Sequence, residues 1–343
     1  CWNFATDTVK QRYYWEPFKD SPFSTLDEAV EELTQALRNS IYIRTLPHLC
    51  PVVSYTSGGL DSRSVLFSAA DPSGLVGLNL YDQPNKESAI AEKLCQAAGV
   101  KYVGFERDDD YYPRWMQQGV RFSGGMWSLE DNHFLGTREF VAKFNPQTVL
   151  TACTSDWLFK GYGLEKQHQQ LFGKNLPTFE FTNQRVNGFL PNYPRQSPPE
   201  FDVEIQERIL SWFDGTPQKL MTDQNRLLVE DKRIRPACYA VSVSSQIMHR
   251  IFPYDTFLAD TKVADCYSRS RAEWKLNGDL WALAIANLCQ RGENIVDANF
   301  GWKVGSSYWQ KLFMFGVGWI KRRIIKQNYL QGLATDGSWP NLS

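Results

Sequence analysis

The sequence predicts an α/β fold in which a parallel, doubly wound sheet is joined to a helical C-terminal part. Three observations support this: short apolar runs alternate with amphipathic stretches between residues 51 and 151, a glycine turn directly follows the first apolar run, and helical periodicity dominates after residue 202. Strands that alternate with helices along a chain form parallel sheets with helices on both faces. We therefore expect ligands at the carboxyl ends of the strands, where such sheets bind them.

The first elements expected are a helix, a strand and a second helix. Thr25 and Glu28 make a capping signature, which predicts a helix over about residues 26–44. Residues 51–55 form a short apolar run typical of a buried strand, and after a Ser-Gly-Gly turn residues 61–70 resume a helical pattern. The order of strand, glycine turn and helix opens the α/β part.

The same alternation continues along the chain. We expect further strands at 75–80, 102–105 and 148–151, with helices at 86–98 and near Trp157. The loops at 56–62 and 152–156 each follow a predicted strand. They should therefore lie together at the ligand-binding edge of the sheet.

Composition divides the chain into four predicted segments. These are an N-terminal segment and helix at 1–45, a glycine-loop α/β core at 46–165, a long loop excursion rich in Gln, Asn, Pro and Gly at 166–200, and a helical C-terminal part at 201–343. The apolar run at 312–320 is too short to cross a bilayer. We expect it to form a C-terminal helix that packs Leu312, Phe313 and Trp319 on the core.

Charge and cysteine content exclude several classes of protein. The 37 basic and 38 acidic residues nearly cancel, which argues against nucleic-acid or membrane partners. The seven cysteines are scattered without a CxxC pair, as expected for a protein of the reducing cytoplasm and not for a disulfide framework or a zinc site. Charged residues near the start of the chain predict that it carries no secretory signal.

The turn after the first strand has the composition of an anion site. Residues 55–64 read Tyr-Thr-Ser-Gly-Gly-Leu-Asp-Ser-Arg-Ser. Glycines and a following helix N-terminus present backbone N–H groups to phosphate, and the hydroxyls of Ser57 and Ser62 can add hydrogen bonds. Asp61 beside a phosphate implies a Mg²⁺ ion between the two negative groups. The alternative is a plain helix cap in which Asp61 only complements the helix dipole.

This stretch resembles the SGGxDS pyrophosphate loop (PP-loop) of N-type ATP pyrophosphatases, and the longer sequence resembles the C-terminal synthetase domain of the asparagine synthetase family. Residues 151–162 are similar to the family's second phosphate motif, SGEGSDEvFgGY, with Asp156, Phe159, Gly161 and Tyr162 in place. Weaker similarity surrounds Arg250, Asp255 and Lys275. The resemblance covers about residues 20–300.

The resemblance implies an adenine nucleotide alpha hydrolase-like fold and an ATP-dependent carbon–nitrogen ligase. Asp61 and Asp156 would share Mg²⁺, and Lys275 would be a late catalytic lysine, although a solvated lysine at a helix end is an equal alternative. The ATP and pyrophosphate ligands would be Thr56, Ser57, Gly58, Gly59, Leu60, Asp61, Ser62, Thr151 and Ala152. A small-molecule or peptide carboxylate would be adenylated, with release of pyrophosphate, and then captured by nitrogen with release of AMP.

The sequence departs from the family pattern where nitrogen is handled. Cys153 replaces the glutamate that assists the incoming nitrogen, Trp157 replaces an acidic residue, and Lys160 replaces a glycine. Asparagine formation is therefore less secure than ATP chemistry. The nitrogen would be ammonia or an amine, with a glutaminase domain outside this chain as one source, since the sequence after Cys1 does not resemble a glutaminase.

Two other functions remain open from the sequence. One is a cyclase of the β-lactam synthetase or lasso-peptide type, which closes a ring with an internal amine. The other is an ATP-binding regulatory module that makes no product.

Overall fold

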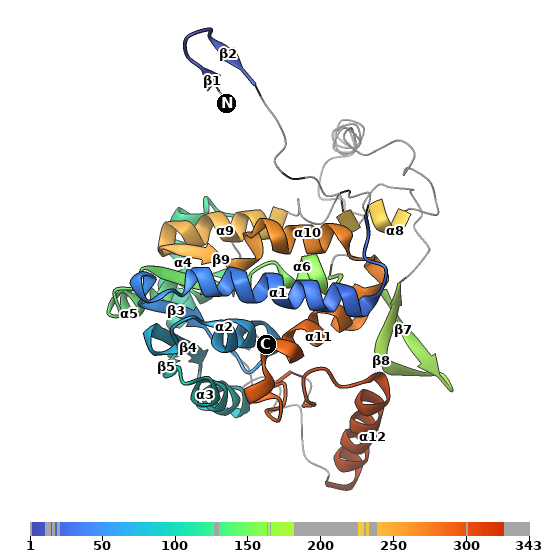
Figure 1. The fold of residues 1–343 in the computed structure, drawn as a ribbon. Helices are drawn as coiled ribbons and strands as arrows, with labels where there is room; N and C mark the ends of the chain where they lie inside the picture. The colour runs from blue at the N-terminus through green and yellow to red at the C-terminus, as the bar shows by residue number, and fades with distance from the viewer. Residues whose placement is uncertain are drawn as a thin grey trace, which may run out of the picture.

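A five-stranded parallel sheet lies at the centre of the computed structural model, and helices cover both of its faces (Figure 1). The architecture confirms the predicted α/β class, with a doubly wound sheet and a helical C-terminal part. The structure describes residues 2–10, 15, 18, 21–126, 130–162, 164, 166–181, 226–229, 231–232, 239–299 and 301–325.

The sheet has the strand order β5-β4-β3-β6-β9. Its strands are β3 (Val52–Tyr55), β4 (Leu75–Tyr81), β5 (Lys101–Glu106), β6 (Thr148–Thr151) and β9 (Tyr254–Thr256). The chain moves outward from β3 through β4 to β5 and then returns to the other side of β3 with β6. The direction of winding thus reverses between β3 and β6, which is where open α/β sheets bind ligands.

Alternate residues of the strands face two separate cores. Val52 packs in one hydrophobic cluster and Val53 in the other, and both side chains are fully buried. A strand buried on both faces shows an unbroken apolar run instead of an alternating pattern. This explains why the central strands appear in the sequence as continuous apolar stretches.

Helices from both halves of the chain cover the face to which Val52 points. They are α1 (Leu26–Arg44), α2 (Leu60–Ser68), α3 (Lys86–Ala98), α10 (Thr261–Arg269) and α11 (Asp279–Leu288). The predicted capping of α1 is confirmed, because the Thr25 hydroxyl accepts a hydrogen bond from the Glu28 N–H at 3.2 Å.

The opposite face is covered by a second group of helices. These are α4 (Tyr111–Ser123), α5 (Arg138–Ala142) and α9 (Tyr239–Ile251). Other described elements lie outside the sheet. They include the short helices α6 (Ser155–Phe159) and α8 (Arg226–Val229) and an N-terminal hairpin of β1 (Trp2–Asn3) and β2 (Thr8–Val9). The N-terminal hairpin stands away from the body of the molecule (Figure 1).

The first part of the predicted loop excursion is regular structure. Residues 166–181 form an antiparallel hairpin of β7 (Lys166–Leu171) and β8 (Lys174–Phe181), whereas 182–200 lie outside the described residues. Phe172 and Gly173 at the turn both have positive φ, as the tightest hairpin turns require. The sequence prediction did not anticipate this hairpin, because β7 is mostly polar and exposed and shows no apolar alternation, and β8 contains a proline.

The last described helix, α12 (Tyr308–Ile325), differs from the prediction that it packs its aromatic residues on the core. It contacts β8 of the hairpin, and the side chain of Phe313 is 70% exposed. The side chain of Trp319 lies outside the described residues. In the described parts of the chain, no helix is both long enough and apolar enough to cross a membrane.

Candidate functional site

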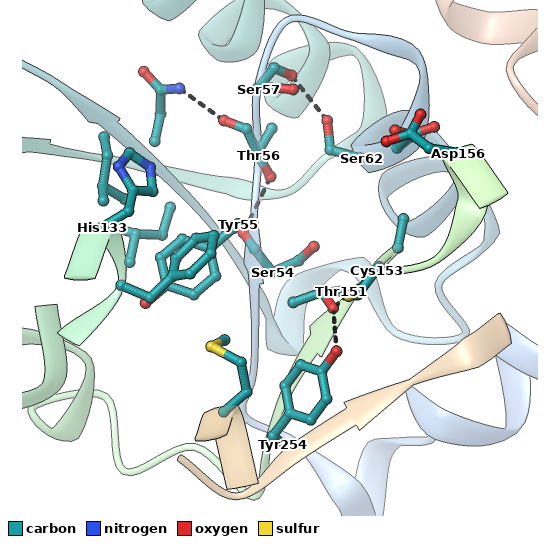
Figure 2. Close-up of a pocket in the computed structure, with 17 residues that line it drawn as sticks. Ser54, Tyr55, Thr56, Ser57, Ser62, His133, Thr151, Cys153, Asp156 and Tyr254 are labelled. Carbon is teal, nitrogen blue, oxygen red and sulfur yellow. Dashed lines mark hydrogen bonds between the residues drawn. The ribbon is translucent and has the colours of Figure 1, made fainter. Parts of the chain in front are cut away.

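A cavity of about 390 Å³ opens at the carboxyl ends of β3, β4 and β6, with Tyr254 of β9 in its wall, beside the reversal in the sheet (Figure 2). This volume is within the range of small-molecule sites. The structure brings seven of the predicted site residues to its wall: Thr56, Ser57, Asp61, Ser62, Thr151, Ala152 and Asp156. Gly58, Gly59 and Leu60 belong to the same loop without lining the cavity, and Lys275 lies elsewhere. The roles of these residues in binding ATP remain predictions.

The buried side chain of Arg63 holds the loop after β3 in shape. Its guanidinium donates hydrogen bonds to the carbonyl oxygens of Gly58 and Gly59, each at 3.1 Å. It also donates to the carbonyls of Ile295 and Val296, at 2.7 and 2.5 Å. Arg63 therefore ties the loop to a segment more than 230 residues away in the sequence.

This arrangement directs the loop's amide groups away from the guanidinium. In a trans peptide the C=O and N–H point in opposite directions, so the N–H groups of Gly59 and Leu60 face away from it. The Gly59 N–H lies 3.2 Å from the hydroxyl of Ser57, and the hydroxyl of Ser62 donates to the carbonyl of Ser57 at 2.9 Å (Figure 2). Hydroxyls and amides thus gather where α2 begins.

Gly58 is required by a close contact and not by its backbone angles. A Cβ atom at Gly58 would lie only 2.6 Å from the Cβ of Ala298, a distance that side chains do not tolerate. The Ala298 N–H also donates to the carbonyl of Gly58 at 3.0 Å. Neither Gly58 nor Gly59 has positive φ. The turn therefore needs glycine at position 58 because a side chain there would clash, and not because the backbone adopts a left-handed conformation.

Lys160 links the two predicted metal-binding aspartates. Its Nζ atom lies 2.8 Å from both carboxylate oxygens of Asp61 and 2.8 Å from Oδ1 of Asp156. The indole N–H of Trp281 donates to Oδ1 of Asp61 at 2.7 Å and so fixes this carboxylate. Burial disfavours the ammonium, but the charges of Asp61 and then Asp156 outweigh this and raise the pKa of Lys160.

The aspartate pair has the right chemistry for Mg²⁺ but is not free to bridge it in this arrangement. Carboxylate oxygens are the ligands that Mg²⁺ prefers. The ammonium of Lys160, however, takes the place between Asp61 and Asp156. In the described part of the chain, no three His, Cys, Asp or Glu side chains gather in a way that could hold a metal ion. The residues as placed do not fit a bridging metal ion.

Lys275, the predicted catalytic lysine, lies in a closed cluster of charges. It is fully buried, and its Nζ contacts Oδ2 of Asp231 at 2.5 Å and lies over the ring of Tyr267. Lys232 shares the same carboxylate at 3.2 Å. Burial lowers the pKa of Lys275 well below its ordinary value, Asp231 opposes this shift, and Lys232 adds to it. The structure does not bring Lys275 to the cavity wall.

A neutral histidine lines the far side of the cavity. Nδ1 of His133 lies 2.9 Å from the guanidinium of Arg107 and 3.0 Å from the hydroxyl of Tyr112. An arginine can only donate, so Nδ1 accepts and the proton of the imidazole sits on Nε2. Burial, and then the charge of Arg107, lower the pKa of His133 to about 3. The side chain therefore stays uncharged across the physiological range.

Cys153 lines the cavity as a protonated thiol. Burial raises the pKa of Cys153, the charge of Asp156 acts in the same direction, and a hydrogen bond with Tyr254 opposes them. The hydroxyl of Tyr254 also pairs with that of Thr151 at 2.9 Å (Figure 2). A neutral thiol cannot accept a proton as a glutamate carboxylate does. Cys153 therefore occupies the position of the motif's glutamate without being able to act as a carboxylate base.

Several residues of the site were not predicted from the sequence. Lys160 was visible only as a departure from the family motif, although its position four residues after Asp156 places both on one side of a helix. Arg63 stands inside the loop motif but gives no local sign that it is buried. Trp281 and His133 come from distant parts of the chain, and no local pattern predicts their place at the site.

Comparison with solved structures gives only distant similarity to known proteins. No protein-family model and no curated protein matches this chain. Solved structures that match include an ammonia-dependent NAD synthetase from Campylobacter jejuni in complex with a nitrate ion, at 18% identity and a TM-score of 0.28. The match covers 40% of this chain and 61% of the neighbour, about three fifths of its length. At so low a TM-score the fold assignment rests on the sheet itself.

Proposed function

We propose that this chain is an ATP-dependent carbon–nitrogen ligase of the PP-loop type, which adenylates a carboxylate and passes it to a nitrogen nucleophile. The carrying observation is that the SGGxDS loop lies at the reversal of a parallel sheet, with Asp61 and Asp156 on the wall of the same cavity. Asparagine synthetase-like chemistry is the parent activity suggested by the two motifs. Mg²⁺ is the expected partner of the nucleotide.

The loop offers phosphate the groups that bind it. The hydroxyls of Ser57 and Ser62 line the cavity where α2 begins, and the Gly59 N–H, which faces away from Arg63, donates to the Ser57 hydroxyl. Such a set neutralises and orients a pyrophosphate leaving group. We assign the pyrophosphate part of ATP to this loop, with Thr151 and Ala152 on the facing wall.

The proposed reaction has two steps. A carboxylate oxygen of the substrate attacks the α-phosphorus of ATP, the bond from that phosphorus to the bridging oxygen breaks, and pyrophosphate leaves. An amine or ammonia then attacks the carbonyl carbon, the bond to AMP breaks, and the nitrogen loses a proton. The protein's contribution to the first step is positioning and stabilisation of the leaving charge.

The cavity favours a substrate without a second carboxylate. None of its described lining residues is a lysine or an arginine, and His133 is neutral. The ammonium of Lys160 touches the wall but is already paired with Asp61 and Asp156. A second carboxylate would therefore lose water without gaining an unpaired cation, and sites reject such unpaired groups strongly. Together with the neutral thiol of Cys153, this favours a specialised ligase or cyclase over asparagine formation. Its place would be the cytoplasm, where ATP is available.

A second candidate is an ATP-binding regulatory module that forms no product. The observation in its favour is the ammonium of Lys160 in the place where the family motif leaves room for a metal ion. The two candidates differ in one measurable property, because only the ligase exchanges pyrophosphate with ATP.

The nucleotide assignment is tested by thermal unfolding with Mg·ATP. Binding should raise the midpoint in proportion to the logarithm of nucleotide concentration. Asp61→Asn should remove much of the Mg²⁺-dependent part of this rise. The control Asp108→Asn, at an exposed ion pair with Arg114, should keep all of it. An unfolding temperature that does not change with millimolar Mg·ATP would refute the nucleotide assignment.

The reaction is tested by isotope exchange between labelled pyrophosphate and ATP across a panel of carboxylic acids. We expect exchange with at least one monocarboxylate, because attack is at the α-phosphorus. We expect little exchange with aspartate, because the ammonium beside the cavity, that of Lys160, is already paired with Asp61 and Asp156. If ADP and orthophosphate are the products, the chain belongs to another class of enzyme. If the protein binds ATP but no acid supports exchange, the regulatory module is favoured.

A further inference from the structure

The position between Asp61 and Asp156 holds a cation that belongs to the protein. The ammonium of Lys160 is within 2.8 Å of oxygens from both carboxylates. Its place in the chain keeps it there, since Lys160 follows Asp156 by four residues and is the residue directly after α6. The indole of Trp281 holds the other carboxylate in place.

An ammonium and a bridging metal ion cannot share this position. A divalent ion bound to carboxylate oxygens at about 2.0–2.1 Å would occupy the same space and repel the positive charge. The side chain of Lys160 is 22% exposed and that of Asp156 is 55% exposed, so the ammonium has a way out toward solvent. The carboxylates can therefore exchange one cation for the other without unfolding the site.

We propose that Lys160 competes with divalent cations for the place between Asp61 and Asp156, so that the bare metal ion is excluded. A divalent cation then enters only together with phosphate groups, which supply further oxygen ligands and give the displaced ammonium a new anionic partner. This second half rests on the proposed function, whereas the competition itself does not. The consequence is a site that takes the metal–nucleotide complex as one unit.

The competition is measured with Mn²⁺ alone, by titration calorimetry or by the electron paramagnetic resonance signal of the free ion. Wild-type protein should bind Mn²⁺ weakly. Lys160→Met, which keeps the aliphatic stem and removes the charge, should bind at least tenfold more tightly. Lys160→Arg should resemble the wild type because it keeps the cation. Lys160→Gln is a second neutral variant for the case in which Lys160→Met does not fold.

Two controls locate the effect. Lys166 lies beside Lys160 and contacts its carbonyl oxygen at 3.0 Å. Lys166→Met therefore removes a nearby positive charge without vacating the position, and it should change Mn²⁺ affinity by no more than about threefold. Adding Asp156→Asn to Lys160→Met should abolish the gain.

Equal Mn²⁺ affinity, within twofold, in the wild type and the neutral variants would overturn the proposal. A gain that persists in the Asp156→Asn background would overturn it as well. Because ATP is absent from this titration, a protein that never binds nucleotide can still show the competition. Conversely, a protein that binds Mg·ATP can still fail this test, so the two proposals stand or fall separately.

Discussion

Lys160 and Lys275 are two lysines that are largely or fully buried and that pair with aspartate. Their surroundings nevertheless shift their pKa values in opposite directions. Lys160 contacts two carboxylates, and its pKa is raised. Lys275 shares the carboxylate of Asp231 with Lys232, and its pKa is lowered. Burial disfavours the ammonium in both. The difference teaches that the ratio of negative to positive groups decides the sign of the shift.

The same comparison bears on which lysine faces the chemistry. Lys275 was predicted to be catalytic from its position in a family pattern, and the structure buries it with Asp231. Lys160 was noted only as a departure from a motif, and the structure places its ammonium against two residues of the cavity wall. Pattern position therefore pointed to a lysine away from the cavity, whereas the departure marked a lysine that contacts two residues of the cavity wall.

The largest expected effect comes from removing the carboxylate beside Lys275. Asp231→Ala removes the carboxylate that the two buried lysines contact, and breaking a buried pair in this way costs about 3–5 kcal/mol of unfolding free energy. Urea unfolding measures the loss. The matched control is Asp279→Ala, at the partly exposed pair with Lys311, where we expect less than about 1 kcal/mol. Equal losses of unfolding free energy in both variants would show that the charges of Asp231, Lys232 and Lys275 are not shielded from water.

A smaller effect distinguishes the two lysines by pH. The pKa of Lys275 is lower in the folded state than the ordinary value of 10.5. Between these two values the unfolded chain binds more protons, so stability should rise with pH as 10.5 is approached. Lys160 has a raised pKa, so its contribution is present below 10.5 and is lost only at higher pH. Urea unfolding between pH 7.5 and 10 should show a shallower rise in Lys275→Met than in the wild type. An unchanged slope would contradict the assigned shift.

The smallest expected effect is that of Lys160 on stability. Its ion pairs are partly open to solvent, and such pairs contribute about 0–1 kcal/mol. Lys160→Met should therefore change the unfolding free energy by less than about 1 kcal/mol, and Lys160→Arg by less still. A loss comparable to that of Asp231→Ala would mean that Lys160 is a structural residue like Lys275, and the contrast between them would vanish.

The sequence was sufficient for the parts of the fold that local patterns determine. The central strands and α1 to α3 were predicted within a few residues, because buried strands and capped amphipathic helices leave strong signals. The strand β9 was missed, since three residues at Tyr254–Thr256 are too few to show a period. The β7–β8 hairpin was missed because the residues of β7 are mostly polar and exposed, so they show no apolar alternation.

The site was predictable only as far as its motifs reach. The loop around Ser57 and the segment around Asp156 were located from the sequence, since each follows a strand that ends at the same edge of the sheet. The contact from Trp281 to Asp61 joins residues 220 positions apart and has no local signature. The place of Lys160 was within reach, because its spacing from Asp156 already put an ammonium beside that carboxylate.

The contacts of Arg63 and Gly58 with residues 295–298 also determine when the site can form. During synthesis the glycine loop emerges long before its partners Ile295, Val296 and Ala298. Contacts so distant in sequence close late, because the entropy of closing the long intervening chain must be overcome first. A nascent chain that ends before residue 295 would therefore contain the SGGxDS sequence and all five strands of the central sheet, while the loop at 56–62 still lacked the contacts that hold its shape. We therefore expect the loop to reach this shape late in folding.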